Sequence, residues 1–165
     1  MIKVGVIGTG YMGSLHARVY SELESVEFVG IFDKDFAGAK ELSSKYNVEA
    51  FASYKDLILN VDALTIATPT IMHYEHAKEC IAAKKHALIE KPFAVNVFEA
   101  QDIIALSEKN GTIIAVGYIE RFNPAVIKLI DLVKEKKIVS IKTERIAPPA
   151  ERANDVSAVF DLMIH

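Results

Sequence analysis

The sequence of 165 residues contains a single cysteine, Cys80, and no tryptophan. One cysteine cannot form an internal disulfide, so we expect the chain to work in a reducing compartment, the cytoplasm. A strong charge of one sign is also missing, because 19 lysines and arginines stand against 22 aspartates and glutamates, for a net charge of -3. So weak a charge, with no basic stripe, argues against nucleic acid as the main partner.

Long hydrophobic runs are absent as well. The longest apolar stretches, such as residues 112–119, are far too short to span a bilayer. The first residues run directly into a strand pattern and do not resemble a secretory signal peptide. We therefore expect a soluble chain with no membrane partner. What the sequence does contain is a globular balance of 51% hydrophobic and 25% charged residues, which excludes a disordered chain.

Short β-branched runs alternate with helical stretches along residues 1–120. Strands are predicted over residues 2–7, 26–32, 48–51, 63–67, 87–89 and 113–116. Helices are predicted over residues 15–23, 37–46, 54–59, 74–83 and 97–108. Such regular alternation predicts an α/β fold: a doubly wound parallel sheet with right-handed crossovers, complete within residues 1–120.

The pattern changes after residue 120. A helix is predicted over residues 124–136, a long alternating strand over 138–146 and an apolar helical segment over 156–164. The strand has no sheet partner within the chain. We therefore expect residues 121–165 to be the truncated start of a second α/β domain, and the chain to be an N-terminal fragment of a larger protein.

A glycine-rich loop follows the first predicted strand and reads Gly8-Thr9-Gly10-Tyr11-Met12-Gly13, a G-x-G-x-x-G motif. In this motif the first glycine allows a tight turn, the second lets the backbone approach a pyrophosphate, and the third lets helix and strand pack closely. The phosphates then lie on the N–H groups at the helix N-terminus. All six residues are therefore candidate cofactor-binding residues.

Asp33 ends the second predicted strand, twenty residues after Gly13, where a carboxylate can hold the ribose hydroxyls of a dinucleotide. A carboxylate repels a 2′-phosphate, so the sequence favours NAD over NADP, although the neighbouring Lys34 could soften that preference. A methyl-donor cofactor uses a related glycine loop, but the third glycine at this spacing is typical of dinucleotide folds. NAD is the expected cofactor.

Further segments follow predicted strands or end the chain, namely residues 67–70 with His73, Glu90-Lys91-Pro92, residues 117–124, and residues 161–165 with the pattern D-x-x-x-H. Together with the glycine loop, they resemble the glucose–fructose oxidoreductase / inositol dehydrogenase (Gfo/Idh/MocA) family over the whole chain. The resemblance implies a Rossmann domain followed by a C-terminal α/β domain with an open sheet. It also implies an NAD(P)-dependent dehydrogenase of a sugar, polyol or related compound, working as a homo-oligomer.

By that resemblance, the catalytic residues are Lys91 of the E-K-P segment and Asp161 and His165 of the D-x-x-x-H segment. Oxidation of a secondary alcohol sends a hydride to the nicotinamide and needs a base for the hydroxyl proton. A histidine such as His165 can accept that proton near neutral pH, and Lys91 can hold the substrate oxygen. Asp161 lies four residues before His165, on one helix face, where it could orient the imidazole or bind substrate. Which of Lys91 and His165 takes the proton stays open.

Further contacts with the cofactor are implied by the same resemblance, from Thr68, Pro69, His73, Glu90 and Lys91. It also places Tyr118 and Arg121 at the cleft between domains. Residues 117–126 and 155–165 are similar to the branch of the family that acts as UDP-N-acetylglucosamine 3-dehydrogenase. A nucleotide sugar is therefore the expected substrate.

The other histidines have simpler explanations. His73, His76 and Cys80 fall on one face of a predicted helix, but structural zinc needs four ligands at recognised spacings and no fourth is offered. No metal site is predicted. His16, on the first predicted helix, is expected to pack or cap rather than to act in catalysis.

Two outcomes for function remain open from the sequence. With the NAD site complete and the substrate-binding sheet missing, the chain should bind NAD and have little or no dehydrogenase activity. The alternative is a non-catalytic Rossmann module that senses NAD or binds a partner, in which Lys91 and His165 are relics.

Overall fold

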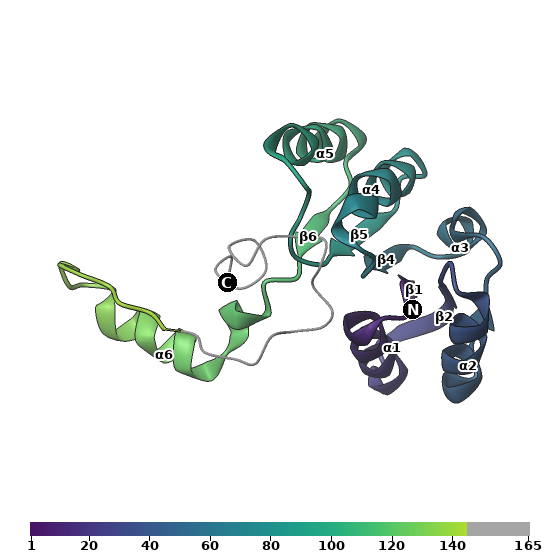
Figure 1. The fold of residues 1–165 in the computed structure, drawn as a ribbon, viewed down its shortest axis with the longest axis horizontal. Helices are drawn as coiled ribbons and strands as arrows, with labels where there is room; N and C mark the ends of the chain where they lie inside the picture. The colour runs from purple at the N-terminus through teal and green to yellow at the C-terminus, as the bar shows by residue number, and fades with distance from the viewer. Residues whose placement is uncertain (145–165) are drawn as a thin grey trace. The chain divides into compact units, whose positions relative to one another are not determined.

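A six-stranded parallel sheet forms the centre of the first part of the chain. The computed structural model describes residues 1–144, which divide into a first unit, Met1–Gly117, and a second unit from Tyr118 onward. The strands are β1 (Ile2–Ile7), β2 (Val26–Phe32), β3 (Glu49–Ala50), β4 (Ala63–Ile66), β5 (His86–Ile89) and β6 (Ile114–Val116). All neighbours pair in parallel, in the order β3-β2-β1-β4-β5-β6 (Figure 1). This is the strand order of a Rossmann fold, so the predicted doubly wound sheet is confirmed.

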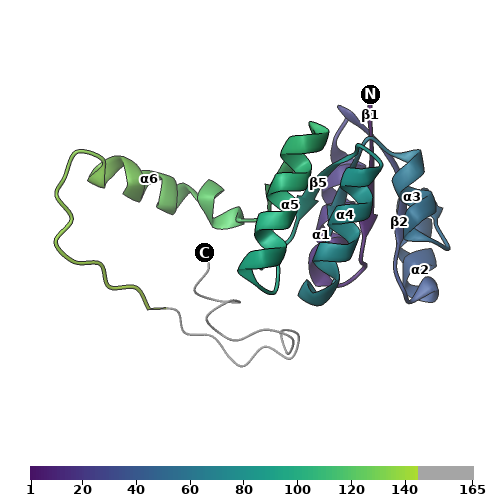
Figure 2. The same ribbon diagram turned by 90° about the horizontal axis from the view of Figure 1, so that it is seen from above.

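Helices cover both faces of the sheet. They are α1 (Tyr11–Glu22), α2 (Phe36–Tyr46), α3 (Tyr54–Asn60), α4 (His73–Ala82) with the preceding 3-10 turn η1 (Thr70–Met72), and α5 (Val97–Asn110). Helices α1 and α2 lie on one face, and α3, α4 and α5 lie side by side on the other (Figures 1 and 2). Because parallel strands cannot be joined by a tight hairpin, each connection crosses back through a helix or loop on one of these faces.

The side chains of β1 show why two helical layers are needed. Val6 is fully buried in a cluster with Ala17 of α1, whereas the next residue, Ile7, belongs to the cluster that contains Ile81 of α4 and Ile103 of α5. Successive side chains of a strand face opposite sides, so β1 is buried on both. This packing holds the carboxyl end of β1 firmly at the point where the glycine loop begins.

Helix α1 begins at Tyr11, four residues earlier than predicted. The last three residues of the glycine motif therefore form its first turn. Close packing explains the difference, because a Cβ atom at Gly13 would overlap the carbonyl oxygen of Gly8. The loop between β1 and α1 is consequently reduced to Gly8, Thr9 and Gly10.

The second unit contains the 3-10 turn η2 (Ile119–Phe122) and helix α6 (Pro124–Val133), which ends before the predicted boundary at residue 136. Asn123 caps α6, since its side-chain oxygen accepts a hydrogen bond of 3.0 Å from the N–H of Ala125. The strand predicted over residues 138–146 is wrong for residues 138–144, which pair with no strand in the described part of the chain. A strand needs a neighbour for its backbone N–H and C=O groups, and an alternating sequence does not supply one.

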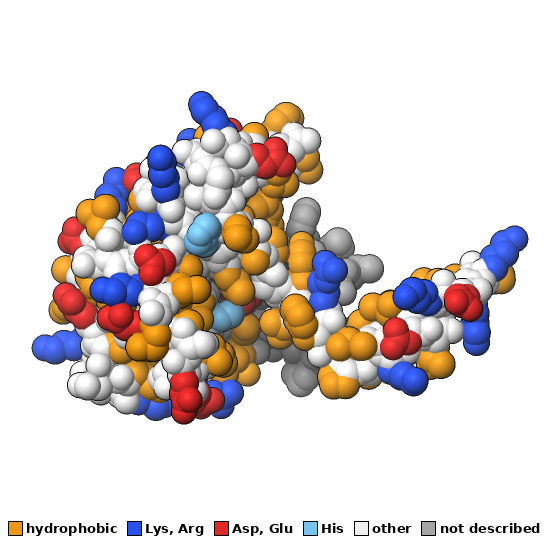
Figure 3. Space-filling view, turned by 180° about the vertical axis from the view of Figure 1, so that it is seen from behind, with side chains coloured by type: hydrophobic (Ala, Val, Ile, Leu, Met, Phe, Trp, Pro, Cys, Tyr) orange, Lys and Arg blue, Asp and Glu red, His pale blue; other side chains and the backbone are white. Residues whose placement is uncertain are grey.

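The helix predicted over residues 156–164 lies outside the described residues. Within residues 1–144, no helix is both long and apolar enough to cross a membrane. On the face of the described residues drawn in Figure 3, acidic and basic side chains are interspersed, and neither sign gathers into a patch. This distribution agrees with the small net charge of the sequence.

Candidate functional site

The predicted site residues of the first unit gather at one edge of the sheet. All six strands are parallel, so their carboxyl ends lie at the same edge. The strand order reverses between β1 and β4, which is where open α/β sheets bind ligands. The residues that follow the strands at this edge are the glycine loop after β1, Asp33 after β2, Thr68 after β4, Glu90 after β5 and Gly117 after β6.

The three glycines of the loop differ in what a side chain would meet. Gly8 has a positive φ of 101°, and a Cβ there would lie 2.5 Å from the carbonyl oxygen of Ala67. Gly8 and Gly13 are therefore required by the fold itself. A Cβ at Gly10, in contrast, would meet nothing within 4 Å, and its φ of -60° suits any residue. The protein's own packing gives no reason for glycine at position 10, so the open space there suits a ligand that approaches the backbone.

The N-terminus of α1 has no side-chain cap among the described residues, and its first turn contains no acidic residue. The first N–H groups of a helix have no partner within the helix and carry partial positive charge. An uncapped N-terminus beside open space is therefore suited to an anion such as a pyrophosphate. The arrangement fits the dinucleotide that the sequence predicts.

The carboxylate of Asp33 is fixed by the glycine loop. Its Oδ2 atom accepts hydrogen bonds from the N–H of Thr9 (2.6 Å) and from the Thr9 hydroxyl (2.9 Å). Its Oδ1 atom accepts one from the N–H of Asp35 (2.8 Å). A carboxylate has about four acceptor positions, so among the described donors these three leave one position on Oδ1 for a ribose hydroxyl. The adenosine side of the predicted site is thus oriented before any ligand binds.

Glu90, at the end of β5, is a buried carboxylate with a histidine partner. It is only 5% exposed, and its Oε1 atom lies 2.7 Å from Nε2 of His16 on α1. Its Oε2 atom accepts a hydrogen bond of 3.3 Å from the N–H of Lys91. Gly117 makes room for this carboxylate, since a Cβ there would lie 2.8 Å from Oε1. The sequence-based expectation that His16 packs or caps did not include this contact with Glu90. The one sequence feature that pointed to His16 is its position three residues after Gly13, on the helix that follows the glycine loop.

His73 connects two loops at the edge of the sheet. Its ring is 1% exposed; Nδ1 lies 2.9 Å from the carbonyl oxygen of Pro92, and Nε2 lies 2.9 Å from that of Thr68. Both ring nitrogens thus lie within hydrogen-bond distance of backbone carbonyl oxygens in the loops that follow β4 and β5. This placement makes His73 a link between the loops that carry Thr68 and Lys91, and its predicted contact with the cofactor stays a prediction.

His76 and Cys80 are buried on the same helix. Burial lowers the pKa of His76, whose Nδ1 lies 3.3 Å from the Thr68 hydroxyl. Burial also raises the pKa of Cys80 to about 12, and its Sγ donates to the carbonyl oxygens of Lys85 and His86. Within residues 1–144, no group of three His, Cys, Asp or Glu side chains is placed to hold a metal ion.

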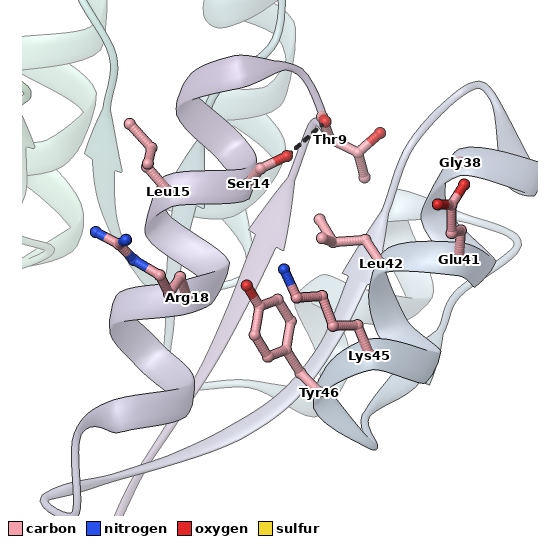
Figure 4. Close-up of a pocket in the computed structure, with 9 residues that line it drawn as sticks. All are labelled: Thr9, Ser14, Leu15, Arg18, Gly38, Glu41, Leu42, Lys45 and Tyr46. Atoms are coloured by element: carbon pink, nitrogen blue, oxygen red, sulfur yellow. Dashed lines mark hydrogen bonds between the residues drawn. The ribbon is translucent and has the colours of Figure 1, made fainter.

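A groove lies between α1 and α2 and meets the glycine loop at Thr9 (Figure 4). Arg18 lines it from α1, and Glu41 and Lys45 line it from α2. Ser14 closes its upper end, where its hydroxyl donates to the carbonyl oxygen of Thr9 over 3.0 Å. Because the charged residues have both signs, the groove by itself indicates no class of ligand.

The predicted catalytic residues are only partly described. Lys91 is half-buried directly after Glu90, and its peptide bond to Pro92 is cis. Asp161 and His165 lie outside the described residues. Tyr118 and Arg121 belong to the second unit, so their place at a cleft between domains stays a prediction.

Comparisons with known proteins agree with this fold. The chain is 34% identical over 167 residues to UDP-N-acetylglucosamine 3-dehydrogenase of Acidithiobacillus ferrooxidans, covering 99% of this chain and 51% of that protein. It is 29% identical over 174 residues to myo-inositol 2-dehydrogenase of Thermotoga maritima, covering 99% of this chain and 52% of that protein. The chain therefore spans about half the length of these curated relatives.

A solved structure of the A. ferrooxidans dehydrogenase matches the chain with a TM-score of 0.86 and 32% identity, covering 99% of this chain and 53% of that one. Residues 2–118 match the family described as "Oxidoreductase family, NAD-binding Rossmann fold", which includes the glycine loop, Asp33 and Glu90. The chain belongs to this family, Gfo/Idh/MocA, and its first unit is an NAD-binding Rossmann fold.

Proposed function

We propose that the chain is the cofactor-binding part of an NAD-dependent dehydrogenase that oxidises a secondary alcohol of a sugar, nucleotide sugar or polyol. The observation that carries the proposal is the uncapped N-terminus of α1 beside the open space at Gly10. The N–H groups of that first turn would hold the pyrophosphate, and Asp33 would hold the adenosine ribose. When bound, NAD supplies the hydride acceptor.

NAD is preferred over NADP in this proposal because of Asp33. The Thr9 and Asp35 donors hold its carboxylate in place, so it cannot turn away from an added phosphate without losing those hydrogen bonds. A 2′-phosphate would place a second negative charge beside it. The exposed Lys34 offsets only part of that repulsion, because interactions between solvent-exposed charges are weak.

Lys91 stands at the carboxyl end of β5, where it would hold the substrate oxygen and stabilise the negative charge that develops on it. The proton would pass to His165 or to Lys91, with Asp161 orienting the imidazole or binding substrate. These roles rest on the family pattern of the sequence. His73 contributes by linking two loops: its ring contacts the carbonyl oxygen of Pro92, next to Lys91, and the carbonyl oxygen of Thr68.

The substrate proposed is UDP-N-acetylglucosamine, oxidised at C3. Support comes from the A. ferrooxidans relative of that name, which matches 99% of the chain. The relatives are about twice as long, so we assign the rest of the substrate site to the half that this chain does not span. The 165-residue chain is therefore proposed to bind NAD with little or no dehydrogenase activity of its own.

Calorimetric titration of the chain with NAD⁺ and NADP⁺ tests the proposal. The expected result is tighter binding of NAD⁺, and a loss of about tenfold in NAD⁺ affinity in Asp33→Ala, which removes the charged ribose acceptor. The same chain should form no NADH from UDP-N-acetylglucosamine and NAD⁺. Tighter binding of NADP⁺ than of NAD⁺, or an unchanged affinity in Asp33→Ala, would show that the cofactor assignment is wrong.

A further inference from the structure

Two carboxylates stand on opposite sides of the glycine loop at the carboxyl edge of the sheet. Asp33 follows β2, and Glu90 follows β5, with β1 and β4 between them in the strand order. Asp33 is half-buried and faces backbone donors. Glu90 is 5% exposed and has the imidazole of His16 as its close partner.

The position of Glu90 relative to a bound dinucleotide follows from the proposed function, on which this inference rests. The two halves of a dinucleotide extend to opposite sides of its pyrophosphate. With the pyrophosphate at the N-terminus of α1 and the adenosine ribose at Asp33, the nicotinamide half extends over β4 and β5. Glu90 is therefore the carboxylate on the nicotinamide side.

The fold is built to keep a carboxylate at this place. Nε2 of His16 lies 2.7 Å from Oε1 of Glu90, and the N–H of Lys91 donates a hydrogen bond to Oε2. Gly117 leaves the space that the carboxylate fills. His16 is the ion-pair partner that the structure gives Glu90 among the described residues. An apolar residue would fill the same space without any of these hydrogen bonds.

We propose that Glu90, held by His16, makes the site bind the oxidised cofactor in preference to the reduced one. The nicotinamide ring of NAD⁺ carries a positive charge, and the dihydronicotinamide ring of NADH carries none. A carboxylate in a largely buried position attracts the first and not the second. The site thus favours loading with NAD⁺ and release of NADH, as a dehydrogenase working in the direction of alcohol oxidation requires.

His16 is a positioning residue in this account. Its Nε2–H donates to Oε1 and holds the carboxylate at the end of β5. Because His16 acts through Glu90, its effect on the cofactor preference depends on the presence of the Glu90 charge. The two residues should therefore be coupled in a double-mutant cycle.

The test measures the dissociation constants of NAD⁺ and NADH for the 165-residue chain, by calorimetry for NAD⁺ and by the fluorescence of the reduced ring for NADH. Glu90→Gln keeps the size of the side chain and one of its two accepting oxygens, and removes its charge. It should lower the preference for NAD⁺ on the order of tenfold. Asp33→Asn makes the same change at the adenosine side, which is identical in both cofactors. It should weaken both equally and leave their ratio unchanged.

A second pair of variants addresses His16. His16→Ala should lower the NAD⁺ preference by less than Glu90→Gln does, and should change nothing further in the Glu90→Gln background. A rise in the NAD⁺ preference in His16→Ala would mean that the imidazole carries a charge opposing Glu90, which overturns the donor role. His16→Ala also keeps the proposal testable if Glu90→Gln fails to give a folded protein by circular dichroism.

The outcomes separate the two proposals. A ratio that is unchanged in Glu90→Gln, while Asp33→Asn weakens both cofactors, overturns the role of Glu90 and leaves the NAD site in place. Asp33→Asn that weakens neither cofactor overturns the proposed function. A ratio that falls in Glu90→Gln and not in Asp33→Asn supports both.

Discussion

The helices within residues 1–144 begin in three different ways. Helices α2, α3, α5 and α6 start with a side chain that accepts a hydrogen bond from their first turn, namely Asp35, Ser53, Asn96 and Asn123. Helix α4 continues directly from the 3-10 turn η1. Helix α1 begins at Tyr11, and its N-cap residue, Gly10, offers no side-chain cap and has open space where a Cβ would stand.

The difference between α1 and the capped helices separates helix starts that stabilise the fold from a helix start that suits a ligand. A capping side chain contributes about 1 kcal/mol to the stability of a helix. Helix α1, which follows the central strand β1, lacks that contribution. The same missing side chain leaves α1 without a side-chain acceptor at its N-terminus, which suits an anion. The N-terminus of α1 is arranged for a ligand, and those of α2, α3 and α5 are arranged for the fold.

The largest effect is expected from placing a cap at the start of α1. Gly10→Asp gives α1 an N-cap, and its backbone angles and surroundings accommodate the side chain. The stability of the free protein should be unchanged or higher by about 0.5 kcal/mol. The new carboxylate would occupy and repel the pyrophosphate position, so NAD⁺ affinity should fall about a hundredfold or more in a calorimetric titration.

Gly10→Ser serves as the matched control, since it also caps the helix but adds no charge. It should weaken NAD⁺ binding less than Gly10→Asp does. If Gly10→Asp bound NAD⁺ as tightly as the natural chain, the contrast between α1 and the other helices would have no bearing on the cofactor.

Removing a cap from α5 should give the opposite pattern. The side chain of Asn96 accepts a hydrogen bond of 2.9 Å from the N–H of Glu99, and Asn96→Ala removes it. The free energy of unfolding should fall by about 1 kcal/mol, measured by denaturant titration. NAD⁺ affinity should stay within about twofold of the natural value once the protein is folded. A loss of NAD⁺ affinity as large as that in Gly10→Asp would contradict the separation of roles.

The smallest effect is expected at Thr9, which lies in the glycine loop and also orients Asp33. Thr9→Val removes the hydroxyl that donates to Asp33 over 2.9 Å and keeps the backbone N–H that donates to the same atom. The carboxylate is then less firmly oriented, and NAD⁺ affinity should fall about threefold. Stability should change by less than about 1 kcal/mol, because Asp33 keeps two of its three donors. A loss of stability without any loss of affinity would place the Thr9 hydroxyl among the structural contacts only.

The sequence predicts best where the relevant signal is local. The glycines at positions 8, 10 and 13 predict a tight turn followed by the start of a helix, and Asp33 lies at the spacing from them that a dinucleotide site requires. The predicted bounds of β1 and β2 are those that the structure has. For β1 the signal is a compact run of apolar residues, which indicates a strand buried on both faces.

Contacts between distant segments could not be predicted in this way. His16 and Glu90 are 74 residues apart, and His73 and Pro92 come from different elements, so no spacing reveals that they meet. Residues 138–144 alternate like a strand, yet a strand depends on a partner that the described residues do not provide. In each case the missing information is the identity of the neighbour in space.

Amide NMR of the chain during titration with NAD⁺ shows whether the start of α1 holds the pyrophosphate. If it does, the amide signals of residues 10–13 shift on binding, together with that of Asp33. The amide signals of residues 97–100, at the capped start of α5, should stay in place. Binding of NAD⁺ that leaves the signals of residues 10–13 unshifted would mean that the pyrophosphate does not lie at the start of α1.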